Sequence, residues 1–312
     1  RDLLDARRDQ SATLLPNGQL LIAGGMSGGA YPATTYAYDP GANAWNTAGT
    51  LPGGGRARQT ATLLPSGRVL LVGGWAGATS SGAADRYEAG IGQWGGAGTM
   101  NSPRADHTAT LLPDGRVLVA GGAGAAGEAR TSTEVYSPET GLWTPLASSL
   151  PGARDAHTAT LLSNGKVLVV GGKSGNSATS TSALFDPGST QTGAEQWSAA
   201  APLHNQRFAH TATLLPNGKV LVAGGNQTSA GSMPLASAEI YDPAQNTWTD
   251  AGSMAFARAF HTATLLPNGN VLVVGGGDAN GSSVSLAYDS AELYDWTNDT
   301  WTTIAQRMPE AR

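Results

Sequence analysis

Six arginines recur along the chain at similar intervals, each at the start of a segment of similar sequence. They are Arg7, Arg56, Arg104, Arg154, Arg207 and Arg258. A guanidinium group offers a planar fork of donors that matches a carboxylate. If the six segments close around a central channel, these side chains lie in a ring at one mouth of it, where they would suit an anionic ligand. The alternative is that each arginine pairs with a backbone carbonyl or a nearby acid and joins neighbouring segments. Occurrence in all six copies favours this alternative, because a binding site rarely needs six equal contributors.

Four histidines follow these arginines by three residues. They are His107, His157, His210 and His261, and Gln10 and Gln59 replace them in the first two copies. Imidazole is a common metal ligand, which makes the four weak candidates for a metal site. Equivalent positions of a ring are too far apart for tetrahedral coordination, and glutamine also forms hydrogen bonds. The pattern therefore favours a polar contact that is repeated for structural reasons, and we predict no metal.

Two aromatic residues lie outside the repeating pattern, in segments that differ between copies. Tyr31 and Trp75 follow Gly-Gly pairs, and packing of the repeated scaffold does not account for them. Aromatic rings beside arginine suit a sugar or a peptide, so both are candidate binding residues. The alternative is that each ring covers a neighbouring loop. The longest loops of this kind, 226–237 and 277–290, are further places where specificity can reside.

The elements that position these residues are strands of a unit repeated about every 50 residues. The clearest copy is RFAHTATLLPNGKVLVAGG, from Arg207 to Gly225, and every copy keeps this interval of 18 from arginine to second glycine. TATLL predicts a strand, PNG a tight turn and KVLVA a buried second strand that ends at the glycine pair. A third predicted strand ends in an aromatic residue at 38, 87, 136, 185, 241 and 294, and a fourth carries tryptophan at 45, 94, 143, 197, 248 and 301.

The apolar run, glycine pair, tyrosine and tryptophan resemble the kelch repeat, and the six copies resemble a six-bladed kelch β-propeller related to the central domain of galactose oxidase. The resemblance covers essentially the whole chain and implies an all-β fold with four antiparallel strands in each blade. We expect one domain, residues 1–312, with blades at approximately 7–55, 56–103, 104–153, 154–206, 207–257 and 258–312. The tyrosines and tryptophans are then structural. Complete units at both ends predict that the last blade meets the first without exchanging a strand.

In kelch domains of ubiquitin-ligase adaptors, an arginine at this repeat position can contact acidic peptides. The resemblance therefore implies an anionic ligand or a protein or peptide partner, while the aromatic residues Tyr31 and Trp75 add a carbohydrate as a further candidate ligand. We predict a non-enzymatic binding or scaffold propeller that uses the loops after the glycine pairs and the arginine-lined channel mouth. Two alternatives stay open, namely a sugar-active enzyme of the mutarotase or epimerase type and a structural spacer without a specific ligand.

The sequence also resembles galactose oxidase and a bacterial sialic-acid mutarotase, which implies two possible reactions: oxidation at a copper-radical centre and proton transfer to a sugar. The copper-radical cofactor requires a tyrosine joined to a cysteine, and this chain has no cysteine, so that chemistry is disfavoured and we predict no cofactor. A mutarotase needs an acid/base pair, for which Glu128 and Arg130 or Asp106 and Asp155 are the nearest candidates. None of these lies in a recognisable catalytic motif.

Composition narrows the partners further. The net charge is −5 and the basic residues form no stripe, which argues against binding to nucleic acids or anionic membranes. No run of about 18 apolar residues occurs, so we predict no membrane insertion. The chain begins with arginine, which suggests a trimmed domain, and its Ala-, Thr- and Ser-rich composition suggests a bacterial source. We expect a monomeric, secreted or cell-surface protein.

Overall fold

Six four-stranded antiparallel sheets make up the described part of the chain, which contains no helix. The computed structural model describes residues 3–188, 195–231, 233–280 and 283–311. The predicted fold class, an all-β six-bladed β-propeller with four antiparallel strands in each blade, is confirmed. The lengthened turn expected in the fourth repeat lies mostly outside the described residues.

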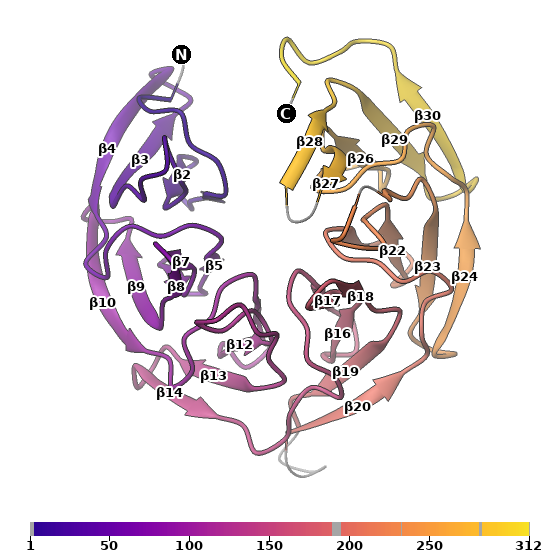
Figure 1. Ribbon diagram of the computed structural model, residues 1–312. Helices are drawn as coiled ribbons and strands as arrows, with labels where there is room; N and C mark the ends of the chain where they lie inside the picture. Colours follow the sequence, from indigo (N-terminus) through magenta and orange to yellow (C-terminus); the bar gives the residue numbers. More distant parts are fainter. Residues whose placement is uncertain (1–2, 189–194, 232, 281–282, 312) are drawn as a thin grey trace. The chain divides into compact units, whose positions relative to one another are not determined.

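The first compact unit, Arg1–Ser149, contains three blades (Figure 1). The first blade comprises β1 (Ser11–Leu14), β2 (Leu20–Ala23), β3 (Thr34–Asp39) and β4 (Ala44–Thr50). The second comprises β5 (Thr60–Leu63), β6 (Val69–Val72), β9 (Ala83–Glu88) and β10 (Gln93–Thr99), with a ribbon of β7 (Trp75–Ala76) and β8 (Thr79–Ser80) in its loop. The third comprises β11 (Thr108–Leu111), β12 (Val117–Ala120), β13 (Thr133–Ser137) and β14 (Leu142–Pro145).

The second compact unit, Leu150–Arg312, contains the other three blades (Figure 1). The fourth blade comprises β15 (Thr158–Leu161), β16 (Val167–Val170), β19 (Ser182–Asp186) and β20 (Gln196–Ala200), with the ribbon β17 (Lys173–Ser174) and β18 (Ser177–Ala178). The fifth comprises β21 (Thr211–Leu214), β22 (Val220–Ala223), β23 (Ala238–Asp242) and β24 (Thr247–Ala251). The sixth comprises β25 (Thr262–Leu265), β26 (Val271–Val274), β29 (Ala291–Asp295) and β30 (Thr300–Ile304), with the ribbon β27 (Gly277–Asn280) and β28 (Ser283–Ala287).

The hairpin that opens each blade follows the predicted turn chemistry. In the fifth blade, Asn217 Oδ1 accepts a hydrogen bond from the backbone N–H of Lys219 at 3.0 Å, and Gly218 has a φ of +79°. The positive φ explains why glycine occupies this position. The following strand, β22, is at most 1% exposed, as its continuous apolar run predicts.

The hydrophobic core of each unit lies between neighbouring blades. In the first unit, one cluster joins Leu70 and Val72 of β6 to Val117 and Val119 of β12. In the second unit, equivalent clusters join β16 to β22 and β22 to β26. Each fully buried valine or leucine stabilises the fold by roughly 1.5–3 kcal/mol, so these second strands are the main source of cohesion between blades.

The repeated tyrosines, the phenylalanine of the fourth blade and the tryptophans form one aromatic pair in each blade, with ring centroids 4.9–5.1 Å apart. The tryptophan indole also reaches the preceding blade. Trp94 Nε1 donates to Thr35 Oγ1 at 2.9 Å, and Trp143 Nε1 donates to the carbonyl of Ala97 at 2.9 Å. These contacts agree with the predicted structural role. No helix of the kind that could cross a bilayer is present among the described residues.

Candidate functional site

The repeated arginines are buried, and their donors are used within the scaffold. The side chains of five of them are at most 1% exposed, namely Arg56, Arg104, Arg154, Arg207 and Arg258. In the fifth blade, Arg207 Nη1 donates to the carbonyl oxygens of Gly224 and Ser237 at 2.7 and 3.0 Å. Its Nη2 donates to Glu239 Oε1 at 2.7 Å. This geometry fits the structural alternative, and a ligand-binding role for these side chains stays a prediction.

Most of these arginines have a carboxylate partner from the third strand of their own blade. The pairs are Arg56–Asp85 at 2.8 Å, Arg104–Glu134 at 3.1 Å, Arg207–Glu239 at 2.7 Å and Arg258–Glu292 at 2.9 Å. In the fourth blade Ala183 occupies this position, and Arg154 bonds instead to neutral oxygens such as Thr181 Oγ1 at 2.8 Å. Burial lowers the pKa of Arg154 to about 10. In the first blade, Arg7 is covered and pairs with Asp5, with Nε and Oδ1 2.6 Å apart.

A second set of bonds explains the constant interval between arginine and glycine. Arg104 Nη1 donates to the carbonyl of Gly121 in its own blade at 2.8 Å, while its backbone carbonyl accepts the N–H of Gly74 from the preceding blade at 2.9 Å. A Cβ atom on Gly73 would lie 2.4 Å from that same carbonyl oxygen, so the junction admits only glycine. Both ends of the interval are therefore fixed by the contact between blades.

The four repeated histidines are buried, with exposures of 5–6%. His261 Nε2 lies 3.0 Å from Thr211 Oγ1 in the first strand of the preceding blade, and His107 Nε2 lies 2.9 Å from Thr60 Oγ1. In the second blade, Gln59 Nε2 donates to a backbone carbonyl of the preceding blade at 2.9 Å. Replacement of histidine by glutamine thus preserves a polar contact between blades.

Within the described residues, one group of at least three His, Asp or Glu side chains is close enough to hold a metal, and it contains none of the repeated histidines. It consists of His204, Glu239 and Asp250. The hydrogen bond from His204 Nδ1 to Asp250 Oδ1, at 2.7 Å, raises the pKa of His204 above its usual value. Glu239 is already engaged by Arg207 and by the backbone N–H groups of His204 and Asn205. His204 and Asp250 therefore form an exposed pair, and the carboxylate of Glu239 beside them is already held by contacts within the scaffold.

A row of unusual backbone conformations accompanies the arginines. The second residue after each arginine has a φ between 51° and 58°, and none is glycine: Asp9, Arg58, Asp106, Ala156, Ala209 and Phe260. In the first unit, Arg58 N donates to Asp9 O at 2.9 Å and Asp106 N donates to Arg58 O at 3.2 Å. Left-handed backbone is uncommon outside glycine, although aspartate tolerates it better than the other types here, and its recurrence in all six blades makes it a feature of the scaffold. Sequence reasoning missed this row, because its residue types differ between copies and only aspartate among them favours a positive φ.

In the first unit this row carries charge and approaches a tryptophan. We call Asp9, Arg58, Trp75 and Asp106 the loop cluster. Arg58 Nε lies 3.4 Å from Asp9 Oδ1, and Arg58 Nη1 lies 3.6 Å from Asp106 Oδ1. The Trp75 indole N–H donates to Asp106 Oδ2 at 2.9 Å. The side chains of Asp9, Arg58 and Asp106 remain 27%, 28% and 19% exposed, so a ligand can reach them.

Of the two aromatic residues proposed for a ligand, Trp75 contacts these charges directly, and Tyr31 contacts the loop that follows Trp75. Trp75 and Tyr31 are both half-buried. The Tyr31 hydroxyl donates to the carbonyl of Gly77 in the next blade at 3.3 Å, so this ring also covers a neighbouring loop. Arg8 is 65% exposed and its Nε lies 4.0 Å from Asp9 Oδ2, which adds an accessible cation. The binding role of Trp75 and Tyr31 stays a prediction.

The acids considered for proton transfer are paired with cations. Glu128 Oε1 lies 3.1 Å from Arg130 Nη2, and Asp155 Oδ1 lies 3.1 Å from Lys173 Nζ. The pKa of Glu128 is lowered by hydrogen bonds from its own backbone N–H and from that of Ala126, and by the nearby charge of Arg130. A carboxyl group whose ionised form is favoured in this way is a poor proton donor at neutral pH.

The long loop of the fifth blade is organised around one buried side chain. Asn226 Nδ2 donates to the carbonyl of Thr228 at 2.7 Å, and Oδ1 accepts the N–H of Met233 at 2.8 Å. Residues 226–237 include no charged side chain. The long loop of the sixth blade lies partly outside the described residues. The first unit therefore offers the better-defined charged surface.

Two families of known sequences match this chain, one near its N-terminus and one over its C-terminal part. The family described as "KLHDC2/KLHL20/DRC7 Kelch-repeats domain" matches residues 106–312, and the "Kelch motif" family matches residues 7–52. "Kelch-like protein 15" of Danio rerio is 29% identical over 135 residues, which are 38% of this chain and 21% of that protein. "Galactose oxidase" of Gibberella zeae is 30% identical over 106 residues, which are 33% of this chain and 16% of that protein. The matched segments thus span about a fifth of these relatives.

Two solved structures share the architecture. The one described as "Structure of YjhT" aligns with a TM-score of 0.72 over 96% of this chain and 97% of that chain, at 15% identity. A "novel fungal alcohol oxidase", in complex with copper, aligns with a TM-score of 0.58 over 89% of this chain and 72% of that chain, at 18% identity. At these identities the likeness concerns the fold alone, and it agrees with the propeller class.

Proposed function

Because the chain belongs to the kelch-repeat family, we propose that it is a non-enzymatic binding propeller whose partner docks on the loop cluster of the first unit. Kelch-repeat proteins commonly act as protein-interaction scaffolds. The observation that carries the proposal for this chain is the distribution of its charges. The repeated arginines are buried and bonded within the blades, whereas Arg58 and its two acids stay partly exposed beside Trp75.

The chemistry of the cluster favours a peptide segment of a protein partner. Tryptophan and arginine are enriched among the residues that dominate binding energy at protein interfaces. Trp75 supplies an apolar ring that its bond to Asp106 holds in place. Arg8 supplies an exposed cation for an acidic side chain of the partner. The hydrogen bonds along the left-handed row fix the backbone, which reduces the entropy lost on binding.

A peptide and glycan array tests this proposal with three variants. We expect the wild-type protein to bind a set of peptides, and Trp75→Ala and Arg58→Ala each to weaken binding at least about tenfold, equivalent to about 1.4 kcal/mol. Ile91→Ala is the control, because Ile91 is 64% exposed in the turn between β9 and β10, away from the glycine-pair loop. Circular dichroism should show that all three variants remain folded.

The outcomes separate the alternatives. Binding of glycans alone would assign the cluster to carbohydrate recognition, and binding that survives both substitutions would contradict the proposed site. Failure to bind any probe would favour a structural spacer. The mutarotase alternative has its own measurement, since the rate of anomeric exchange of a reducing sugar, followed by NMR, should equal the rate in buffer alone.

A further inference from the structure

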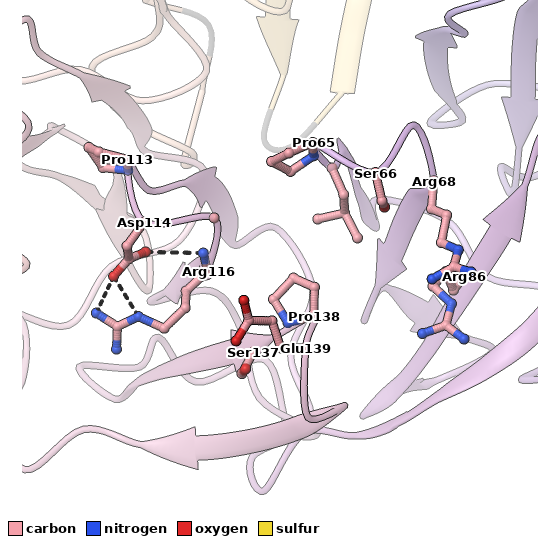
Figure 2. A pocket seen from close by; sticks show the side chains of 12 residues that line it. Pro65, Ser66, Arg68, Arg86, Pro113, Asp114, Arg116, Ser137, Pro138 and Glu139 are labelled. Carbon is pink, nitrogen blue, oxygen red and sulfur yellow. Dashed lines mark hydrogen bonds and ion pairs between the residues drawn. The ribbon is translucent and has the colours of Figure 1, made fainter.

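A cavity of about 590 Å³ lies between the second and third blades of the first unit (Figure 2). Residues 64–68 and 113–116, which form the turns after β5 and β11, contribute to its walls together with Arg86 of β9 and residues 137–139. The loop cluster precedes β5, whereas the cavity follows it, so the two sites lie at opposite ends of this strand. The volume lies in the range of small-ligand sites.

Arg86 departs from the pattern of the repeat. It directly precedes the tyrosine of its blade, where the other five blades carry an apolar residue: Ala37, Val135, Leu184, Ile240 and Leu293. In the second unit, Leu184 and Ile240 pack against the cores between blades. Arg86 is instead half-buried on the cavity wall. It forms no hydrogen bond or ion pair with the residues that the structure describes.

The third blade departs from the repeat at the same cavity. The residue after the aromatic position is acidic in the other five blades, at Asp39, Glu88, Asp186, Asp242 and Asp295, but it is Ser137 in the third. In the second blade that acid pairs with the cation after the turn, with Arg68 Nη2 and Glu88 Oε1 2.7 Å apart. Arg116, the equivalent cation of the third blade, pairs with Asp114 of its own turn at 2.7 Å. Because Ser137 stands where the other blades have an acid, the cavity wall carries one negative charge fewer.

Glu139 is the third departure. The equivalent positions hold Gly41, Gly90, Gly188, Ala244 and Thr297. Within the described chain its carboxylate has no hydrogen bond and no ion pair. Figure 2 shows Arg68 and Arg86 on one side of the cavity and Asp114 with Arg116 on the other. Since Arg68 and Arg116 have carboxylate partners, Arg86 and Glu139 remain as one cation and one anion available to a ligand.

We propose that this cavity binds a peptide segment that carries one acidic and one basic side chain, the acid on Arg86 and the base on Glu139. Guanidinium–carboxylate pairs form strong, directional hydrogen bonds, and a ligand with both charges neutralises both unpaired groups. Pro65, Pro113 and Pro138 line the same cavity and offer rigid apolar surfaces for the side-chain stems. The site is independent of the loop cluster, with which it shares no residue.

The experiment uses capped tripeptides with glutamate and lysine at their ends, in both orders, and NMR of the Arg86 side-chain Nε–H in the full chain. Arg86→Leu and Glu139→Gly restore residues found in other blades, so both variants should fold. We expect each to weaken binding at least about tenfold, as loss of a charged hydrogen bond implies. Trp75→Ala should bind the tripeptides as the wild type does, which separates this test from that of the loop cluster.

Two further probes make the result decisive. A tripeptide with glutamine at both ends should bind at least about tenfold more weakly than the charged ones. Equal affinity for charged and uncharged tripeptides, or an unchanged affinity in Arg86→Leu, would overturn the proposal. Preferential binding of free lysine, with no binding of the capped tripeptides, would also overturn it by assigning the cavity to a free amino acid.

Discussion

At the scale of single residues, a buried guanidinium acts here as a structural connector. Arg104 donates to three backbone carbonyls, a serine hydroxyl and a carboxylate, while its own carbonyl accepts a bond from the preceding blade. Removing one member of a buried ion pair costs about 3–5 kcal/mol, because it leaves a charge without compensation. Arg154 shows that one such arginine is tolerated with neutral acceptors alone, although burial lowers its pKa.

Ala183→Glu should stabilise the protein. It places a carboxylate where the third, fifth and sixth blades have one, and Arg154 is already desolvated. We expect the free energy of unfolding to rise by about 1.5–3 kcal/mol, the contribution of hydrogen bonds to a charged group. Urea denaturation measures the effect, and Ala183→Gln is the control of equal size. A glutamate variant no more stable than the glutamine variant would contradict this account of the charge.

His261→Gln should reduce the sensitivity of the fold to acid. Burial, assisted by the charge of Arg258, lowers the pKa of His261 to about 3, well below the value near 6.5 of an exposed imidazole. The unfolded chain therefore binds more protons in this window, and stability falls as the pH drops from about 6.5 towards 3. Glutamine keeps a hydrogen-bonding group, as Gln59 does in the second blade. Unfolding curves from pH 7 to 4 should fall less steeply in the variant; parallel curves would argue against a role for this group.

At the scale of elements, the junction between blades depends on glycine. Gly73 has a φ of +63°, and a Cβ there would meet the Arg104 carbonyl at 2.4 Å. We expect Gly73→Ala to destabilise the fold by about 2–4 kcal/mol, from the clash and the unfavourable backbone conformation together. Gly95→Ala in the same blade is the matched control, because Gly95 has no positive φ and nothing within 4 Å of a Cβ. Thermal melts that shift equally for both variants would show that the junction is not the cause.

The repeat allowed strands, turns and blades to be predicted because each depends on local patterns. The apolar run, the turn glycine and the aromatic pair each have one physical explanation that holds in all six copies. The candidate site was harder to predict, because its geometry depends on contacts between blades. Trp75 was identified as an exception to the repeat, but its bond to Asp106 and the charge of Arg58 between two acids arise from segments far apart in the sequence. Arg86 and Glu139 could have been found by comparing equivalent positions across the six copies.

At the scale of the whole molecule, we expect a monomer of 31.6 kDa in solution. The large apolar side chains that are exposed among the described residues come from separate segments of several blades, rather than from one strand or loop. Isolated exposed apolar residues are usual on monomeric proteins. Light scattering coupled to size-exclusion chromatography measures the mass, and a stable dimer at micromolar concentration would contradict this expectation.

The central claim is that the loop cluster binds a peptide partner, and the indole N–H resonance of Trp75 tests it most directly. A peptide identified on the array is titrated into the ¹⁵N-labelled protein, and the resonance is assigned with Trp75→Phe. We predict that the Trp75 signal shifts with the same dissociation constant as binding, because the ligand contacts the ring or competes for Asp106. A saturable titration in which the Trp75 signal stays unchanged while other tryptophan signals shift would contradict the claim.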